Sequence, residues 1–240
     1  MTAPLLQTQD LSMHFGGVRA VRHVNFTLAE GELRCLIGPN GAGKSTFFKM
    51  LTGQLEPTHG QVLFRGQDIS HAHAHDIARL GVGIKTQVPS VFDGLSVREN
   101  IWLAASRIHS GGKAGRVVDE MLERVGMTAA AERPVGQLAH GQRQWVELGL
   151  VLATDPELIL LDEPAAGMTH EEVNKTAELV REINRTRALI VVEHDMQFIA
   201  MIAKQVTVFN QGSVLVEDSV ENIMRNPQVR DIYLGKQAVA

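Results

Sequence analysis

The start of the chain alternates apolar and polar residues with a period of two. The alternation runs from Leu5 to Leu28 and breaks once, at Phe15-Gly16-Gly17. It predicts a two-stranded antiparallel hairpin with its turn at the two glycines. Gln61–Phe64 is followed by the turn Arg65-Gly66-Gln67, and this pattern predicts a further strand at a sheet edge.

A second kind of strand is short and apolar throughout. Glu32–Ile37 leads into a glycine-rich turn, after which we expect a helix from Lys44 towards Gly53. Further strands, with helices between the first three, are predicted at Leu158–Asp162, Leu189–Val192, Val206–Asn210 and Ser213–Glu217. Alternating strands and helices predict an α/β fold with a parallel sheet at its core.

The middle of the chain changes to a helical pattern. It runs from Ser96 to Thr154, with a break at Gly111-Gly112 and a last helix from about Arg143 to Ala153. We interpret it as a helical part inserted into the core. Residues 1–240 then form a single domain, in which residues 1–87 and 155–240 make the core with its antiparallel β part and residues 88–154 make the helical subdomain.

Composition narrows the class of protein. The 240 residues are 44% hydrophobic and 21% charged, as in an average soluble globular protein. A net charge of −4 gives no electrostatic reason to expect a nucleic-acid partner. The single cysteine, Cys35, fits a reducing compartment and predicts a buried strand residue. Met1–Asp10 does not resemble a signal peptide, and no apolar run reaches the about 18–20 residues that cross a bilayer.

The glycine-rich turn has the pattern of a phosphate-binding loop, G-x-x-x-x-G-K-[ST]. Its glycines let successive backbone N–H groups curl around a phosphate, and the helix that follows adds the positive end of its dipole. Lys44 is expected to reach the outer phosphates of ATP, and the Ser45 hydroxyl to hold Mg²⁺. The expected nucleotide contacts are Gly38, Pro39, Asn40, Gly41, Ala42, Gly43, Lys44, Ser45 and Thr46.

An acidic strand end completes the pattern of a nucleotide hydrolase. In enzymes with this loop, the acid at the end of a buried strand positions Mg²⁺, and we assign that role to Asp162. Glu163 lies on the other face of the strand and is the candidate general base for water in line with the γ-phosphate. A third segment, Leu138-Ala139-His140-Gly141-Gln142, places a glycine turn before a helix and is a second anion-binding device.

Three alternating histidines, His71, His73 and His75, would share one face of a strand and form a metal site. The same stretch favours a helix over Ala74–Leu80 instead. We therefore expect these histidines to be solvated.

Taken together, these segments resemble ABC-transporter ATPase subunits over almost the whole chain. Leu138–Gln142 resembles the family signature L-S-G-G-Q, whose residues contact the nucleotide of a neighbouring subunit. The resemblance implies a RecA-like P-loop NTPase core with an antiparallel β subdomain and a helical insert. It also implies that Gln87 contacts Mg²⁺ and water, that His194 touches the γ-phosphate and that Phe15 stacks on adenine. Ala166-Gly167-Met168-Thr169 is similar to the D-loop, which crosses between subunits.

The sequence departs from the family pattern at three positions. Ala139 replaces the signature serine, so the hydroxyl contact to a γ-phosphate is missing. A lost hydrogen bond to a charged group costs about 1.5–3 kcal/mol. His140 replaces a glycine, and Thr169 replaces the usual acidic or asparagine residue of the D-loop.

Several stretches resemble the ATPase subunits of importers for branched-chain amino acids and urea. They are His14–Val18, Gln87–Phe92, Val192–Met196 and Tyr233–Lys236. Two more, His140–Trp145 and Glu163–Thr169, favour the urea or short-chain amide branch. The resemblance leaves a branched-chain amino acid importer and a lipopolysaccharide-type exporter open as alternatives.

The resemblance also implies an assembly. Two ATPase subunits, of related but different chains, would enclose two ATP molecules with Mg²⁺ and drive two transmembrane permease subunits. An external substrate-binding protein would select the cargo, and no nucleic acid takes part. The chain would be peripheral, at the cytoplasmic face of the inner (plasma) membrane, and would contact the membrane only through the permease, near Gln87–Asn100.

Two other classes of function compete with this one. A soluble ABC-type protein of translation or DNA repair usually carries two cassettes or a long coiled coil, which this chain lacks. A regulatory module that binds ATP without hydrolysing it is disfavoured by Glu163, although Ala139 keeps it open.

Overall fold

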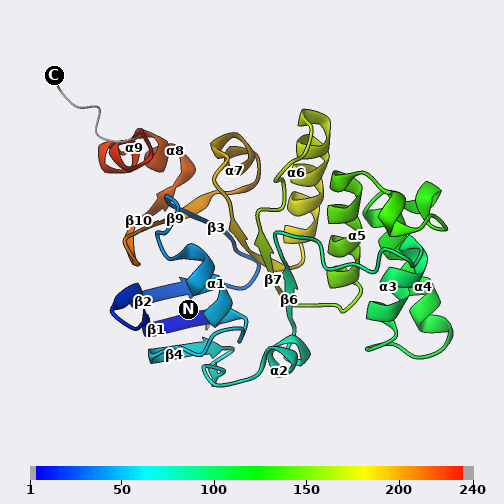
Figure 1. Cartoon of the computed structure of the whole chain (residues 1–240), viewed down its shortest axis with the longest axis horizontal. Helices are drawn as coiled ribbons and strands as arrows, with labels where there is room; N and C mark the ends of the chain where they lie inside the picture. The colour runs from blue at the N-terminus through cyan, green and yellow to red at the C-terminus, as the bar shows by residue number, and fades with distance from the viewer. Residues whose placement is uncertain (1–3, 235–240) are drawn as a thin grey trace.

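An antiparallel sheet is built from the start of the chain. The computed structural model describes residues 4–234, and in it the strand order of this sheet is β2-β1-β4-β5. Figure 1 shows β2, β1 and β4 side by side. Its strands are β1 (Leu6–Phe15), β2 (Val18–Leu28), β4 (His59–Phe64) and β5 (Gln67–Asp68). The predicted hairpin is confirmed, with Phe15 paired to Val18 across the glycine turn. The expectation that Gln61–Phe64 forms an edge is wrong, because the chain turns back after Phe64 and β5 pairs with the outer side of β4.

The second sheet has the order β10-β9-β3-β8-β7-β6. Its strands are β3 (Leu33–Ile37), β6 (Val82–Lys85), β7 (Leu158–Asp162), β8 (Ala188–Val192), β9 (Gln205–Asn210) and β10 (Ser213–Ser219). All neighbours pair in parallel except β10, which is antiparallel to β9. The predicted α/β fold with a parallel core is confirmed.

Strand β6 was not predicted, because glycine and lysine interrupt its apolar pattern. Gly83 is required by packing: a Cβ there would lie 2.6 Å from the Val151 side chain of the neighbouring helix. Lys85 ends the strand with its side chain 1% exposed. A charged residue is almost never fully buried without a partner, so the sequence pattern alone does not reveal this strand.

The helices are α1 (Lys44–Leu51), α2 (Ala74–Arg79), α3 (Val97–Ala105), α4 (Gly112–Arg124), α5 (His140–Leu152), α6 (His170–Asn184), α7 (Met196–Ile202), α8 (Val220–Arg225) and α9 (Pro227–Leu234). The predicted helical middle corresponds to α3, α4 and α5, which lie together at one side of the molecule (Figure 1). In residues 4–234 no helix is both long and apolar enough to cross a membrane. Gly235 and Lys236, part of a predicted importer-like stretch, lie outside the described residues.

Helix α2 begins at Ala74, as predicted, and leaves His71 and His73 before its first turn. His71, His73 and His75 are all exposed, which confirms the expectation that they are solvated.

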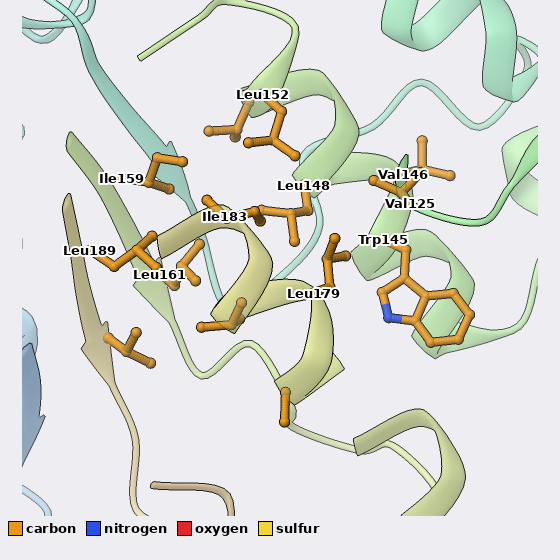
Figure 2. Packing of buried hydrophobic residues seen from close by; sticks show 14 of the residues in the cluster. Val125, Trp145, Val146, Leu148, Leu152, Ile159, Leu161, Leu179, Ile183 and Leu189 are labelled. Carbon is orange, nitrogen blue, oxygen red and sulfur yellow. The ribbon is translucent and has the colours of Figure 1, made fainter. Parts of the chain in front are cut away.

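The parallel sheet is buried on both faces, and its side chains alternate between two hydrophobic clusters. On β7, Ile159 and Leu161 point towards α5 and α6, where they meet Leu148 and Ile183 (Figure 2). Leu158 and Leu160 point the other way, towards α1 and the antiparallel sheet. Burying each such side chain contributes roughly 1.5–3 kcal/mol, so both faces of β7 stabilise the position of the acidic residues at its end.

Candidate active site

The phosphate loop lies between the end of β3 and the start of α1. Two of its glycines are required by close backbone approach as well as by their positive φ angles of 149° and 103°. A Cβ at Gly38 would lie 2.3 Å from the backbone oxygen of Phe209, and one at Gly43 would lie 2.5 Å from that of Ala20. The loop is therefore held against β9 and β2 in one conformation.

Lys44 is the first residue of α1, and its side chain folds back over the loop. Its Nζ donates hydrogen bonds to the backbone oxygens of Gly38 at 2.6 Å and Pro39 at 3.1 Å. Partial burial lowers the pKa of Lys44, and the nearby charges of Glu163 and Asp162 act in the opposite direction. The backbone of the loop thus surrounds the Lys44 ammonium group.

A cleft of about 710 Å³ opens over this loop. Phe15 and Glu163 line it together with loop residues from Asn40 to Thr46, so the structure brings together most of the predicted nucleotide contacts. Phe15 is 47% exposed, which leaves its ring available for stacking. Sequence reasoning missed Arg19, Arg22 and Gln211, which also line the cleft; the two arginines follow the Phe15 turn closely enough to have been suspected.

Asp162 and Glu163 follow the buried strand β7. Burial and the charge of Glu163 raise the pKa of Asp162, while Lys85 and Lys44 oppose the shift. Glu163 has a φ of +44°, unusual for a residue with a side chain, and its N–H donates to the Val192 oxygen at 2.9 Å. This backbone conformation is one of the sparsely populated ones that cluster at functional sites.

Two predicted residues from separate loops meet at the Glu163 carboxylate. Gln87 Nε2 donates a hydrogen bond to Oε2 at 2.7 Å, and His194 Nδ1 lies 3.5 Å from Oε1. Gln87 follows β6 and His194 follows β8, the strands on either side of β7. Because parallel strands end at the same edge of a sheet, the three side chains converge beside the cleft.

The residues present fit ATP and Mg²⁺. The first N–H groups of α1 have no acceptor within the helix and are available to phosphate oxygens. Ser45, Asp162 and Gln87 offer a hydroxyl, a carboxylate and an amide oxygen, which are the hard ligands that Mg²⁺ prefers. Mg²⁺ held there would neutralise charge on the phosphates.

The signature-like turn differs from the prediction in where its helix begins. Helix α5 starts at His140, three residues before the predicted Arg143, because Ala139 is extended and Gln142 Oε1 accepts the Ala139 N–H at 3.2 Å. His140, Gly141 and Gln142 are therefore in the first turn, where N–H groups are free of helical partners. Among the described residues, none from Leu138 to Gln142 lines the nucleotide cleft of its own chain.

His140 links the turn to two other loops. Its Nε2 lies 3.2 Å from the Ala166 oxygen and 3.2 Å from Gln144 Nε2. Gln144 Nε2 also donates to the Gln87 oxygen at 3.2 Å. The histidine thus occupies space that a glycine would leave open, and it connects the signature turn with the D-loop and with the segment after β6.

Thr169 caps α6 with its side chain. Its hydroxyl accepts the Glu172 N–H at 3.3 Å, and the Glu172 carboxylate accepts the Thr169 N–H at 2.9 Å. The same carboxylate packs against Gly141, where a Cβ would lie 2.4 Å from Oε1. The threonine that departs from the family pattern therefore has a local role within this chain.

Comparisons with known proteins agree with the geometry. The family model described as "ABC transporter" matches residues 21–166. The chain is 36% identical to the high-affinity branched-chain amino acid transport ATP-binding protein LivG of Escherichia coli, over 98% of this chain and 100% of that protein. It is 34% identical to the high-affinity branched-chain amino acid transport ATP-binding protein BraF of Pseudomonas aeruginosa, over 98% of this chain and 100% of that protein. It is 32% identical to the lipopolysaccharide export system ATP-binding protein LptB of Acidithiobacillus ferridurans, over 97% of this chain and 98% of that protein.

Solved structures show the same fold. Crystal structures of an ATP-binding cassette of an ABC transporter, one nucleotide-free and one in its ADP conformation, each superpose with a TM-score of 0.87 at 25% identity. Each comparison covers 98% of this chain and 100% of the other. The chain belongs to the ABC transporter family and is one of its ATP-binding, ATP-hydrolysing subunits.

Proposed function

We propose that this chain hydrolyses ATP to power an ABC importer of the branched-chain amino acid and urea group. The observation that carries the catalytic part is the Glu163 carboxylate, which lines the nucleotide cleft and is held by Gln87 and His194. A general base must lie within hydrogen-bond reach of the water that it activates, and a fixed carboxylate facing the phosphate loop meets that condition.

Each residue has a distinct part in this reaction. Glu163 takes a proton from water as the water oxygen bonds to the γ-phosphorus and the bond to the ADP oxygen breaks. Lys44 binds the outer phosphates, and His194 contacts the γ-phosphate. Asp162, Ser45 and Gln87 hold Mg²⁺, and Phe15 stacks on adenine.

The position of the signature turn supports a paired assembly. Leu138–Gln142 presents the start of α5, with its N–H donors, outside the cleft of its own chain. Such a helix N-terminus is suited to a phosphate of a second subunit. We infer a pair of ATPase subunits, the second being a related but different chain, with each turn completing the other's site.

A permease is the partner that the exposed apolar surface fits. ABC-transporter ATPase subunits work with transmembrane permease subunits. The segment after β6 is fastened to α3, because Asn100 Oδ1 accepts the Phe92 N–H at 2.8 Å and Asn100 Nδ2 donates to the Phe92 oxygen at 3.0 Å. Large apolar residues are exposed along these two segments and just after the end of α3: Val88, Phe92, Trp102, Leu103 and Ile108.

Such a surface marks an interaction site. We propose that one of the two permease subunits docks there, that an external binding protein delivers the cargo, and that the chain is held peripherally at the cytoplasmic face of the inner membrane.

Two cargoes compete. Urea or a short-chain amide is the prediction from the residues at His140–Trp145 and Glu163–Thr169. Similarity to LivG and BraF over the full length favours branched-chain amino acids. The lipopolysaccharide export relative is 32% identical, so export stays the alternative outside the importer group.

Uptake separates these cargoes. Labelled urea and labelled leucine are supplied to source cells that lack the chain, to cells with it restored, and to cells with the Lys44→Ala variant. Urea uptake that returns only with the intact chain supports the urea cargo, and the same result with leucine supports the amino acid cargo. If neither uptake depends on the chain, the importer proposal is wrong.

A further inference from the structure

Glu193 is a buried carboxylate for which the reaction above gives no role. It follows β8 directly, precedes His194 and is 2% exposed. In the part of the chain that the structure describes, no Lys or Arg nitrogen lies within 4.0 Å of its oxygens, and the basic nitrogen that does is His194 Nδ1, at 3.8 Å. An unpaired buried carboxylate is costly, so its hydrogen bonds must compensate for the lost hydration.

Those hydrogen bonds join the two catalytic loops. Oε2 accepts the N–H of His194 at 3.0 Å and that of Asp195 at 3.4 Å. Oε1 accepts the Ala165 N–H at 3.3 Å, in the loop that carries Glu163. Burial raises the pKa of Glu193, and these three N–H groups oppose the shift. One side chain thus holds the loop of the candidate base and the loop of His194 at a fixed separation.

Apolar packing does not fill the space between the same loops. A cavity of about 290 Å³ lies there, lined by residues that include Ala165, Met168, Glu193 and His194. Close packing normally fixes neighbouring segments, and a cavity removes part of that constraint. Beside the Glu163 N–H bond to the Val192 oxygen, the three N–H groups at Glu193 are therefore contacts that help to set where His194 stands relative to Glu163.

We propose that Glu193 is a positioning residue that holds His194 against Glu163 and ties both to the D-loop segment that begins after Ala165. The proposal rests on the roles given above to Glu163 and His194. It predicts that Glu193 acts on the reaction chiefly by holding His194 against Glu163.

The test is a double-mutant cycle on ATP hydrolysis by the full chain with its partner subunits. Glu193→Gln keeps the side-chain volume but turns an amide NH₂ towards one of the backbone donors. We expect kcat to fall about tenfold or more, with the KM for ATP within about twofold of the original. In a His194→Ala background, whose residual turnover is followed with radiolabelled ATP, the same change should lower kcat by less than about twofold.

Matched variants separate positioning from loss of fold. Glu32→Gln also removes a carboxylate that accepts a backbone N–H, that of Ala29 at 2.9 Å, just before β3. We expect it to leave kcat unchanged. Circular dichroism and thermal unfolding check each variant, and Glu193→Asp, which keeps the charge but has a shorter reach, replaces the glutamine variant if that one does not fold.

The outcomes distinguish the two proposals. Undiminished kcat in a folded Glu193→Gln chain overturns the inference, as does an equal loss in both backgrounds, and both leave the role of His194 intact. Full turnover in His194→Ala alone contradicts the proposed function at that residue and removes the basis of the inference with it.

Discussion

Gln87 Nε2 donates a 2.7 Å hydrogen bond to Glu163 Oε2, across 76 residues of sequence. The segment that carries Gln87 continues directly into the exposed apolar residues Val88 and Phe92. A movement of that surface would therefore disturb the hydrogen bond to the carboxylate that lines the nucleotide cleft. Under the proposed function, the contact is a physical route by which a docked permease would control hydrolysis.

Replacing the candidate base tests the catalytic assignment. Glu163→Gln keeps an oxygen that accepts from Gln87 but cannot take a proton from water. We expect kcat to fall about 10²–10⁴-fold while ATP still binds. Turnover and nucleotide binding are measured on the same preparation, and surviving turnover would show that another group is the base.

Lys44→Ala removes the cation that the phosphate loop encloses. A hydrogen bond to a charged group contributes about 1.5–3 kcal/mol, so the affinity for ATP should fall about 10- to 150-fold. Lys113→Ala, on the exposed start of α4, serves as the control and should bind as before. Titration with a fluorescent ATP analogue measures both, and equal affinities would rule out the assigned contact.

Ala139→Ser restores a hydroxyl at the cap of α5. Ala139 stands at the N-cap with no side-chain hydrogen bond, and a serine oxygen there can accept a first-turn N–H. The cap should add about 0.5–2 kcal/mol, or about 2–4 °C of melting temperature per kcal/mol. ATP-dependent pairing of subunits should also strengthen. Calorimetry and sedimentation check the two effects, and a change in neither would contradict the interpretation of the turn.

Lys85 and Glu147 form a buried pair, with Nζ 3.7 Å from Oε2. Lys85→Met leaves the carboxylate buried without its cation, which should cost about 3–5 kcal/mol of unfolding free energy. Lys85→Met with Glu147→Leu should recover most of that loss. Urea unfolding measures each variant. If the double variant is no more stable than the single one, the charge is not what destabilises it.

The same pair gives a dependence on pH. Burial raises the pKa of Glu147 above its ordinary value. In the folded protein the Glu147 carboxyl therefore stays protonated up to a higher pH than in the unfolded chain. Burying its charged form without a cation destabilises the fold fully only above the pKa of the folded state. The destabilisation by Lys85→Met should shrink as the pH falls through that value. Unfolding free energies of the variant and the original chain are measured over a pH series. A constant difference between the two would contradict this prediction.

Trp102→Glu tests the proposed docking surface. Trp102 is exposed on α3, away from the cleft, so hydrolysis by the isolated chain should stay unchanged. A charge at an apolar interface is costly to bury, so pull-down with the permease and cargo uptake should both be lost. Retained uptake would place the docking surface elsewhere.

Local patterns predicted the fold and the phosphate loop, since a loop, its strand and its helix are adjacent in sequence. Tertiary packing decided what was missed. Lys85, Glu147 and Glu193 are buried by elements distant in the chain. The residues next to Lys85 and Glu147 in sequence do not indicate this burial. Glu193 has one sequence signal, because it is a carboxylate directly after an apolar strand, as Asp162 is. Helices α8 and α9 also had signals, because Ser219 caps the first and Asn226 with Pro227 begins the second.

Glu163 has a left-handed backbone conformation directly before Pro164. At this position, selection for stability and selection for hydrolysis favour different residues. Glycine or asparagine would adopt that conformation at less cost, which for a glutamate is on the order of 1–3 kcal/mol. A lineage selected for stability alone would drift towards those residues, whereas the proposed role of Glu163 as the base opposes that drift in a lineage that must turn over nucleotide. On that proposal, the identity of residue 163 in a descendant chain records whether hydrolysis was still under selection.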